Sequence, residues 1–544
     1  MSRRREPADA GTGASAGART PTAGRSAVLR STAVLTALAA VSGLLGFVRD
    51  AAIAAVFGVD SAVDAYLVAQ GLMNLVLALV VAAAAKALIP AVSRSVAEGA
   101  PRRSDALAST VLTLALAVLV PSAAGMALAA ETVIGVLAPG FPPEAAAEAA
   151  RLTRIMLLAT VLVAGTDILA AVCQAHGRFF FSGLQGIPFN LVMIVATVVL
   201  GARWGADALA VGFVVGSALR LLVQLPAVRA AGVRLRPSLH VRHPDFAEVV
   251  RLMPALLLGT ALVNVNTLVD RAVGSGEAEG TIAALSYGWR LVTLPYTLLV
   301  ISLVAALYPA LSTLAAPDRR TELRRTTERA LGGVLAVLTP IVVLLLVVTE
   351  PLVRVFLGRG QFDRTAVEIT ATAISWFALG LVGVATVEIC SRAFYALGDS
   401  RTPVALSVLG MVVNVSGDLS LGRAFGVAGL AASTTASFLF VAAAQVAALH
   451  ARHRAVELSA LRGRLLRCSL AGLVAGGAAW LITVFLPPSP GAALTDVAVL
   501  ALAAAGCLAV YIGALACLGG PELAEFRGMI PRRRRPGTGT PNPA

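Results

Sequence analysis

Long apolar runs recur along the whole chain, and they constrain its fold more than any other feature. Stretches of about 20 apolar residues follow one another from Ser31 to Leu518, and each is long enough to cross about 30 Å of hydrocarbon as a helix. Of the 544 residues, 14% are charged and the mean hydropathy is +0.83, whereas soluble proteins carry about 25% charged residues. The short alternating segments of a transmembrane β-barrel are absent. The sequence therefore predicts an all-α polytopic membrane protein.

About fourteen transmembrane helices are predicted. They lie near residues 30–57, 64–92, 105–130, 151–174, 182–202, 206–228, 250–271, 281–312, 326–349, 366–396, 403–421, 424–449, 467–486 and 492–518. Arginines concentrate in alternate loops, which predicts that these loops are cytoplasmic, because short cytoplasmic loops are enriched in Lys and Arg. An even number of helices then places both termini in the cytoplasm. Such a protein is embedded in membrane lipids.

An internal repeat with an offset of about 220 residues divides the chain. Lys86-Ala-Leu-Ile-Pro-Ala-Val-Ser resembles Ala306-Leu-Tyr-Pro-Ala-Leu-Ser, and Ala175-His-Gly177 before Asn190 resembles Ala396-Leu-Gly398 before Asn414. Chance similarity in an Ala- and Leu-rich chain is the alternative. A repeat in the same order and topology predicts two pseudo-symmetric six-helix lobes around a central cavity, with two C-terminal helices added.

The expected domains follow from this repeat and from the composition of the tails. They are a disordered cytoplasmic tail (1–26), an N-lobe (27–230), a basic cytoplasmic linker (231–249), a C-lobe (250–450), helices 13 and 14 (451–520), and a disordered basic cytoplasmic tail (521–544). The tails are too polar to form a packed core.

Several function classes are disfavoured. The net charge of +14 comes from arginines in short loops, which indicates a membrane topology signal rather than nucleic-acid binding. The five cysteines are scattered without metal-ligand or redox spacing, and the five histidines fall in loops or at helix ends. No G-x-x-x-x-G-K-[ST] motif occurs. We therefore expect neither an enzyme nor an ATP-driven transporter.

Ionisable residues inside the predicted spans are the candidate functional residues, because each costs several kcal/mol unless it faces a partner or water. Arg49 and Asp50 lie in the first apolar run, after Gly43 and Gly46, which permit a bend. The alternative is an adjacent ion pair at a helix end. Arg290 lies deep in the eighth run, where lining a cavity is favoured over facing lipid.

Lys86, the single lysine of the chain, is a further candidate, although its side chain could instead extend to the headgroups. A second set is acidic: Asp270 ends the seventh run, and Asn414 and Asp418 lie four residues apart on one helix face, with Thr434 in the next run. Oxygen atoms of this kind suit a hard cation such as Na⁺. Interhelical hydrogen bonding among the same polar groups is the alternative.

The chain resembles the MurJ/MviN lipid II flippase family of the multidrug/oligosaccharidyl-lipid/polysaccharide exporter superfamily. The resemblance runs from about Leu29 to His450. It rests on motifs that occur in the family's order, namely Gly46-Phe-Val-Arg-Asp50, Leu137-Ala-Pro-Gly-Phe141, Ser286-Tyr-Gly-Trp-Arg290, Phe356-Leu-Gly-Arg-Gly-Gln-Phe-Asp363 and Asp399-Ser-Arg-Thr-Pro403.

This resemblance implies two lobes that open alternately to each side and cavity arginines that hold the pyrophosphate and sugar-peptide headgroup. Arg49 and Arg290 match cavity arginines, and Asp50 matches the acid beside them. It also implies a sodium site made of Asp270, Asn414, Asp418, the Leu430 carbonyl and Thr434. A location in the plasma membrane of a bacterium is implied by the same resemblance.

The chain departs from the family's pattern in two places. Ser42-Gly43 stands where the family has Ser-Arg, and Met73-Asn74 is followed by Leu-Val-Leu-Ala where the family has Pro-Asn-x-x-Arg. Two cavity arginines are therefore missing. Lys86 could compensate in part, as a point charge rather than a bidentate fork.

The function expected from the resemblance is translocation of a lipid-linked peptidoglycan precursor, lipid II, to the outer leaflet by alternating access, with Na⁺ as a coupling ion. Cell-wall synthesis proteins are expected partners. One alternative is a flippase for another polyprenyl-linked glycan. A cation-coupled drug exporter is a second alternative, but it requires an aromatic-rich cavity, and aromatic residues make up 5% of the chain. A non-transport scaffold would not explain Arg290 or Asp418 within the spans.

Overall fold

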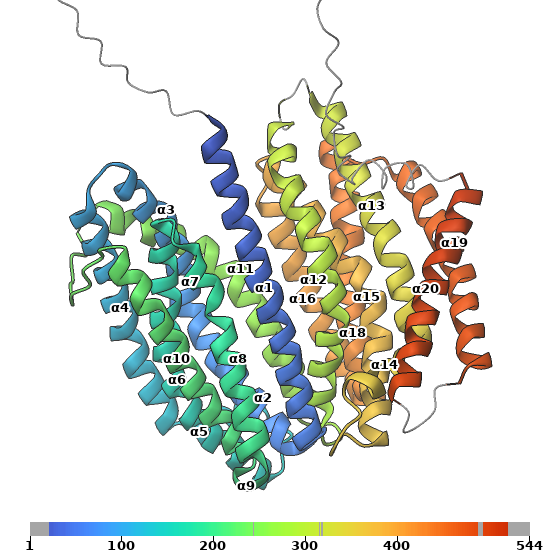
Figure 1. Ribbon diagram of the computed structural model, residues 1–544, viewed down its shortest axis with the longest axis horizontal. Helices are drawn as coiled ribbons and strands as arrows, with labels where there is room; N and C mark the ends of the chain where they lie inside the picture. Colours follow the sequence, from blue (N-terminus) through green and yellow to red (C-terminus); the bar gives the residue numbers. More distant parts are fainter. Residues whose placement is uncertain (1–20, 243, 315, 317–318, 488–492, 520–544) are drawn as a thin grey trace, which may run out of the picture.

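The computed structural model describes residues 21–242, 244–314, 316, 319–487 and 493–519 (Figure 1). This part of the chain is helical and contains no strand. Twelve of its helical segments are long and apolar enough to cross a membrane. α11 (Pro244–Gly274) and α12 (Thr281–Thr313) have spanning lengths of 31 and 33 residues, but some of their side chains are outside the described set. The polytopic all-α class is confirmed, whereas the exact number of fourteen stays a prediction.

The first half of the chain forms one group of helices, which we call the N-lobe. It occupies one side of Figure 1 and consists of α1 (Pro21–Phe57), α2 (Ser61–Leu77), a π-helical turn η1 (Ala78–Ala82), α3 (Ala83–Ala97), α4 (Pro101–Leu128), α5 (Ala130–Leu137), α6 (Pro143–Ala175), α7 (Phe179–Leu184), α8 (Gly186–Val195), η2 (Ala196–Leu200), α9 (Gly201–Trp204) and α10 (Asp207–Ala230).

The second half forms the C-lobe and an appended helix pair. The C-lobe consists of α11, α12, α13 (Arg320–Val347), α14 (Thr349–Phe356), α15 (Arg364–Ala396), α16 (Arg401–Gly417), η4 (Asp418–Gly422), α17 (Arg423–Phe425), α18 (Val427–Ala448) and η5 (Leu449–His453). The pair α19 (Leu458–Phe485) and α20 (Ala493–Cys517) packs on α13 through its own small apolar cluster, which includes Cys468, Ala475 and Tyr511.

The two lobes repeat each other in backbone detail. η2 and α9 end at Gly205 (φ 56°, ψ −143°), and η4 and α17 end at Gly426 (φ 57°, ψ −130°). The turns after α6 and α15 also match, because Gly177 and Gly398 have φ of 73° and 77°, a conformation that glycine adopts without steric cost. These matching turns agree with the predicted repeat.

Several predicted boundaries were wrong. α1 begins at Pro21 and α11 at Pro244, so residues 21–26 and 244–249 are helical rather than disordered or linker. A proline at the first helical position explains both starts, since its fixed φ suits the helix and its missing N–H is not needed there. The short helices α5 and α14 were not predicted. The remaining residues of both predicted tails lie outside the described part of the chain.

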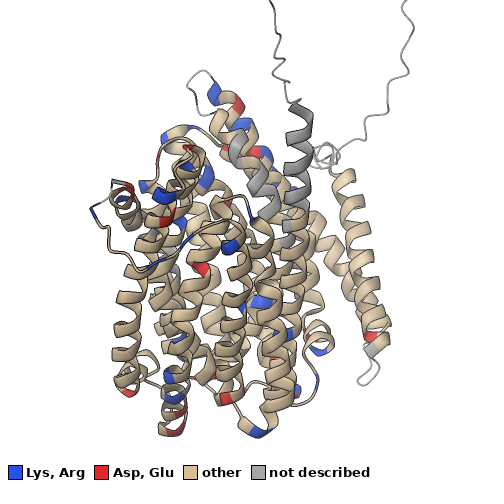
Figure 2. Cartoon of the chain, turned by 60° about the vertical axis from the view of Figure 1, so that its left-hand side comes forward, with Lys and Arg blue, Asp and Glu red and all other residues tan. Residues whose placement is uncertain are grey.

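We name the two ends of the bundle by their connections. The terminal face carries the start of α1, the end of α20 and the α10–α11 connection, and the distal face carries the α1–α2, α11–α12 and α14–α15 connections (Figure 1). Lys and Arg gather toward the terminal face in Figure 2. The arginines there include Arg94, Arg102, Arg103, Arg229, Arg234, Arg236, Arg242, Arg319, Arg320, Arg324, Arg325, Arg452 and Arg454.

Candidate functional site: a cavity between the two lobes

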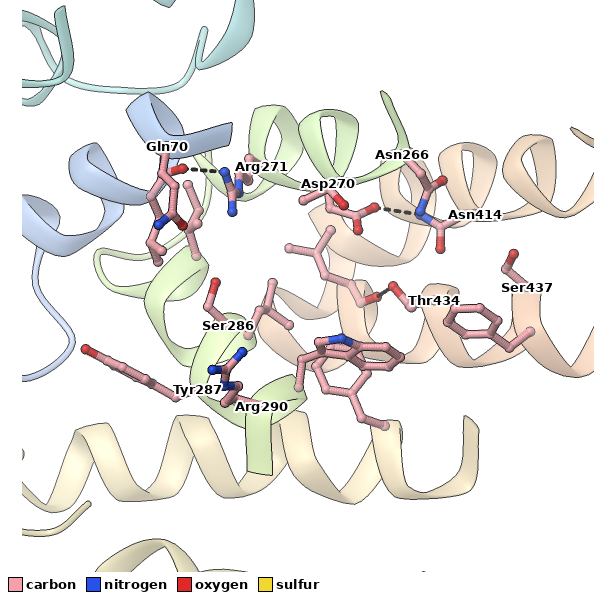
Figure 3. A pocket seen from close by; sticks show the side chains of 18 of the residues that line it. Gln70, Asn266, Asp270, Arg271, Ser286, Tyr287, Arg290, Asn414, Thr434 and Ser437 are labelled. Atoms are coloured by element: carbon pink, nitrogen blue, oxygen red, sulfur yellow. Dashed lines mark hydrogen bonds between the residues drawn. The ribbon is translucent and has the colours of Figure 1, made fainter. Parts of the chain in front are cut away.

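A cavity of about 600 Å³ lies between the lobes (Figure 3). Its wall comes from α1 and α2 of the N-lobe and from α11, α12, α15, α16 and α18 of the C-lobe. Its charged lining residues are three arginines and two aspartates, Arg49, Asp50, Asp270, Arg271 and Arg290. Among the described lining residues, positive charge therefore exceeds negative charge by one.

Arg49, Asp50 and Arg290, predicted from sequence to act together, meet at the cavity wall. The guanidinium of Arg49 donates to Asp50 Oδ1 through Nε (3.0 Å) and Nη2 (2.7 Å). Arg290 Nε lies 3.0 Å from the other carboxylate oxygen of Asp50. One acid thus bridges an arginine of its own helix and an arginine of the opposite lobe. The simple alternative of an isolated pair at a helix end is wrong, because Asp50 has a second partner.

Gly46 makes this arrangement sterically feasible. A Cβ atom at position 46 would lie 2.8 Å from Arg290 Nη2, closer than unbonded atoms approach. Helix α1 is assigned as one uninterrupted helix from Pro21 to Phe57. Gly46, which the sequence analysis considered as a point where the helix can bend, gives the Arg290 guanidinium room.

Arg49 is further held by α8. Asn190 Oδ1 accepts from Arg49 Nη1 at 3.1 Å, and Asn190 Nδ2 donates to the Ser42 carbonyl at 3.1 Å. The Arg49 guanidinium carbon also lies 5.9 Å from the Phe189 ring centre, within the range of a cation–π contact. The sequence analysis noted Asn190 as a repeat marker but missed this contact.

Arg271 was missed altogether. It follows Asp270 on α11, and its Nη1 donates to the backbone carbonyl of Leu67 on α2. Figure 3 shows this bond between the lobes. The sequence signal was available, since Arg271 lies directly beside the candidate residue Asp270, but the sequence analysis did not consider it.

The predicted acidic cluster also assembles. Asn414 Nδ2 donates to Asp270 Oδ1 and to Asp418 Oδ2, each at 2.7 Å, so two carboxylates lie side by side at one amide group. Asp418 is fully buried and also accepts from the Ser433 hydroxyl. It begins η4, and π-helical turns occur often at functional sites.

Leu430 and Thr434 complete this cluster on α18, where the Thr434 hydroxyl donates to the Leu430 carbonyl at 3.1 Å. Two amide oxygens nearby, Asn414 Oδ1 and Asn266 Oδ1, are buried and have no hydrogen-bond partner in the described part of the chain. Asn266 precedes Asp270 by one helical turn on α11. Two carboxylates, a carbonyl, a hydroxyl and unsatisfied amide oxygens are a donor set that fits a hard monovalent cation.

Aromatic side chains cover the C-lobe side of the cavity. The Trp289 ring stacks on Phe438 (centroids 5.8 Å apart, interplanar angle 10°) and meets Phe377 edge-on at 5.3 Å. Tyr66 and Tyr287 also line the cavity. The low aromatic content of the whole chain therefore did not predict the local composition of the wall.

Lys86 lies elsewhere. Its side chain is exposed on α3 and is not among the residues that line this cavity. Its role in substrate binding stays a prediction.

A second intramembrane ion pair lies inside the N-lobe. Arg220 Nη2 is 2.9 Å from Asp167 Oδ1, and Gln185 accepts from the same guanidinium.

Backbone contacts close the distal side between the lobes. Gln361 N, in the α14–α15 connection, donates to the Ala55 carbonyl of α1 at 2.9 Å. Gly360 has a positive φ of 63°, and a Cβ atom there would lie 2.0 Å from the same carbonyl oxygen. The approach of the two backbones thus requires glycine at this position.

A carboxylate of the N-lobe also caps a helix of the C-lobe. The buried side chain of Asp64 on α2 accepts from Gly280 N (2.9 Å) and Ala283 N (2.7 Å) at the start of α12, where unpaired N–H groups and the helix dipole favour an anion. Beside it, burial and a hydrogen bond with Glu279 raise the pKa of Asp60, while that hydrogen bond lowers the pKa of Glu279. The two acids therefore interact across the lobe boundary.

A two-lobed helical bundle with a charged cavity between the lobes and one closed end defines the class of polytopic membrane transporters. Within this class, the sequence profile described as "Lipid II flippase MurJ" matches residues 53–494. The chain belongs to the MurJ lipid II flippase family.

Curated relatives agree with this assignment. The protein named "Lipid II flippase MurJ" from Burkholderia cenocepacia is 27% identical over 418 residues, which cover 75% of this chain and 80% of that protein. A "Probable lipid II flippase MurJ" from Rhizobium meliloti is 26% identical over 518 residues, covering 90% and 94%. Twelve candidate spans and these bacterial relatives indicate a multi-pass bacterial membrane protein.

Solved structures agree in fold. A structure described as "Lipid II flippase MurJ, inward closed conformation" superposes with a TM-score of 0.74 at 20% identity, covering 89% of this chain and 99% of the other. An inward-facing multidrug resistance MATE family transporter of the MOP superfamily gives a TM-score of 0.63 at 16% identity, covering 77% and 95%. These likenesses concern the arrangement of helices.

Proposed function

We propose that this chain translocates lipid II, the polyprenyl-pyrophosphate-linked peptidoglycan precursor, from the cytoplasmic to the outer leaflet by alternating access. One observation carries the proposal: three guanidinium groups, those of Arg49, Arg271 and Arg290, line a cavity between two helical lobes. Arginine binds phosphate oxygens through charge-assisted, often bidentate hydrogen bonds. The family consists of flippases, so the activity we expect is movement of the substrate without bond making or breaking.

The charge balance supports a guest that carries phosphates. Burying unpaired charge is costly, and Asp50 alone neutralises Arg49 and Arg290 only in part. A pyrophosphate would supply the missing negative charge and could replace Asp50 as partner of Arg290. The aromatic wall around Trp289 gives sugar rings an apolar surface, while the polyprenyl tail would stay in the lipid.

We also propose that the terminal face is cytoplasmic, which makes this structure a state closed toward the outside. The arginine-rich terminal-face loops support this orientation. A natural probe tests it, because Cys517 at the end of α20 is exposed while the other four cysteines are buried. A membrane-impermeant maleimide should label Cys517 in inverted vesicles and leave it unlabelled in intact spheroplasts. Labelling in intact spheroplasts would reverse the orientation.

The main test combines depletion with a leaflet-specific assay. In a strain depleted of its own flippase, expression of this chain should restore growth and clear lipid II from the cytoplasmic leaflet, and Arg290→Ala should do neither although it inserts normally. Arg102→Ala, at an exposed position on the terminal face, is the matched control and should behave as wild type. Accumulation of a different polyprenyl-linked glycan upon loss of this chain would redirect the proposal to that substrate.

We propose in addition that Asp270, Asn414, Asp418, the Leu430 carbonyl and Thr434 hold Na⁺ as a coupling ion. The paired carboxylates and the unsatisfied amide oxygen of Asn414 support this. A bound cation would cancel the repulsion of two adjacent carboxylates and draw α11, α16 and α18 together. Transport by Asp418→Asn should no longer depend on Na⁺ when choline replaces it, and an unchanged dependence would eliminate the site.

The drug-exporter alternative requires a cavity without excess positive charge, whereas the flippase proposal requires a positively charged one. An exporter of organic cations would be impeded by an excess of positive charge, since each like-charge contact in a dry cavity is unfavourable. Export of a cationic dye that is faster with Arg290→Ala than with the intact chain would favour this alternative.

Cell-wall synthesis proteins remain proposed partners, and co-purification after cross-linking would identify them.

A further inference from the structure

Arg271 crosses from the C-lobe to the N-lobe at the cavity wall. Its helix, α11, begins the second half of the chain but packs along α2 and α3 of the N-lobe, and its guanidinium donates to the Leu67 carbonyl of α2. A Cβ atom at Gly71 would lie 2.0 Å from Arg271 Nη1 and 3.1 Å from its Cζ. The absence of a side chain at position 71 therefore creates the seat on α2 in which the guanidinium lies.

Arg290 crosses the same boundary in the same manner. It lies over Gly46 on α1 and reaches Asp50, one helical turn further along. Each of the two arginines thus lies over a glycine of an N-lobe helix. Its acceptor is on the same helix, four residues from that glycine. Both line the cavity (Figure 3).

The acceptors differ in charge. Arg290 binds a carboxylate, whereas Arg271 binds a neutral carbonyl inside the continuous helix α2 (Ser61–Leu77). That carbonyl already accepts from the helix itself, so Arg271 uses its second lone pair. Among the described residues, no carboxylate forms an ion pair or hydrogen bond with Arg271. It is the cavity arginine with the weakest partner.

We propose that Arg271 is a third phosphate-binding cation of the cavity, which exchanges its hydrogen bond to the Leu67 carbonyl for hydrogen bonds to the pyrophosphate when substrate binds. This inference rests on the proposed function and deepens it. Hydrogen bonds between a guanidinium and phosphate are about twice as strong as bonds between neutral partners. This exchange of partners therefore favours substrate binding.

The exchange of partners links occupancy to lobe movement. Arg271 joins α11 to α2, and Arg290 joins α12 to α1. A pyrophosphate in the cavity competes with both acceptors at once, so its binding breaks the Arg290 contact between the lobes and frees Arg271 from α2, on which α11 stays packed. Arg271 also supplies a cation to a cavity that lacks two arginines of the family pattern, a compensation that the sequence analysis had assigned to Lys86.

Binding measurements on the purified full-length chain in detergent test this proposal. The ligands are lipid II, undecaprenyl pyrophosphate and inorganic pyrophosphate, and the variants are Arg271→Gln, Arg271→Lys and Gly71→Ala. Gly43→Ala is the matched control, because a Cβ atom at position 43 meets nothing within 4 Å. Arg271→Gln should weaken binding of both polyprenyl ligands about tenfold or more, since a hydrogen bond to a charged group is lost, and Arg271→Lys should lie between it and wild type.

Gly71→Ala separates a phosphate ligand from a purely structural strut. The new methyl group displaces the guanidinium from Leu67 without removing its charge, so we expect binding of pyrophosphate ligands to be equal to or tighter than that of wild type. A strut without a binding role predicts the reverse, namely unchanged affinity in Arg271→Gln and lower thermal stability in both variants. If Arg271→Gln does not fold, weaker binding by Gly71→Ala overturns the proposal by itself.

The design also separates this inference from the proposed function. If wild type binds none of the polyprenyl ligands, the proposed function fails. If wild type binds lipid II and Arg290→Ala does not, but Arg271→Gln binds as wild type, only the role of Arg271 fails. Equal affinity for inorganic pyrophosphate and for undecaprenyl pyrophosphate would assign the site to the free anion rather than to the lipid headgroup.

Discussion

The two lobes carry related polar sites with opposite charge design. The repeat pairs Asp50 of the N-lobe with Asp270 of the C-lobe, and Asn190 with Asn414. In the N-lobe, the Arg49 guanidinium lies between acid and amide and binds both. In the C-lobe, the amide binds the acid directly.

The flanking residues explain this difference. Val269 corresponds to Arg49, and Asp418, four residues after Asn414, corresponds to Ile194, four residues after Asn190. The N-lobe site therefore carries one positive and one negative charge, whereas the C-lobe site carries two negative charges. In the N-lobe site, Arg49 neutralises the acid permanently. In the C-lobe site, no hydrogen bond from an arginine to the two acids is seen among the described residues, so a bound, exchangeable cation would stabilise them. One architecture thus provides a substrate-facing anchor in one lobe and a candidate ion site in the other.

The largest effect is expected when the N-lobe site is given the C-lobe residue. Arg49→Val removes one partner of Asp50, and loss of one member of a buried pair costs about 3–5 kcal/mol. We expect no rescue of a flippase-depleted strain and a lower unfolding temperature in detergent. Arg49→Lys, which keeps the charge, should retain partial rescue. Full rescue by Arg49→Val would show that the N-lobe cation is dispensable.

A paired amide substitution should separate the two sites by their response to Na⁺. Asn414→Ala should abolish any rise in unfolding temperature caused by Na⁺, whereas Asn190→Ala should keep that rise and slow transport several-fold because Arg49 loses a partner. A cation present at ten times its Kd stabilises the folded state by about 1.4 kcal/mol. Thermal unfolding in Na⁺ and in choline measures this. A shift lost in Asn190→Ala instead would move the ion site to the N-lobe.

The smallest effect concerns the matching turns after α6 and α15. Hydrogen bonds from the side chain and backbone N–H of Thr402, with a contribution from His453, lower the pKa of Asp399 to about 2. Because the folded pKa is depressed, this stabilisation is present above about pH 4 and is lost as the pH falls toward 2. We expect about 1 kcal/mol after allowance for solvent screening.

The N-lobe turn provides the control for this titration. Arg178 stands where Asp399 stands in the C-lobe, and it donates to the Ala230 carbonyl. Asp399→Asn should therefore flatten the acid limb of thermal stability measured between pH 4 and pH 2, and Arg178→Gln should leave it unchanged. An acid limb that persists in Asp399→Asn would assign it to other carboxylates.

Much of the site was accessible from the sequence because ionisable residues within apolar spans are rare and costly. Arg49, Asp50 and Arg290 were expected together, and they meet around one carboxylate. The acidic set around Asn414 was expected together and also meets. The bond between Arg271 and Leu67 was not accessible, since its acceptor is a backbone carbonyl that carries no signature of its own.

The aromatic wall was missed for a related reason. Composition counts residues over the whole chain, whereas helix packing selects which of them face one another, and it brings Trp289 between Phe377 and Phe438. Glycine roles were misjudged similarly. Gly46 and Gly71 give room to arginines that are 244 and 200 residues away in sequence, and no local pattern records this.

The sequence by itself determined the membrane class, the two-lobed repeat and the charged residues that lie within the bilayer. The length of an apolar run and the position of a charge within it can be read directly from the sequence. The tertiary structure decided which acceptor each arginine binds, which glycines make room for them and which face of the bundle is closed. These depend on contacts between helices far apart in the chain, where geometry at the level of one methyl group separates contact from collision.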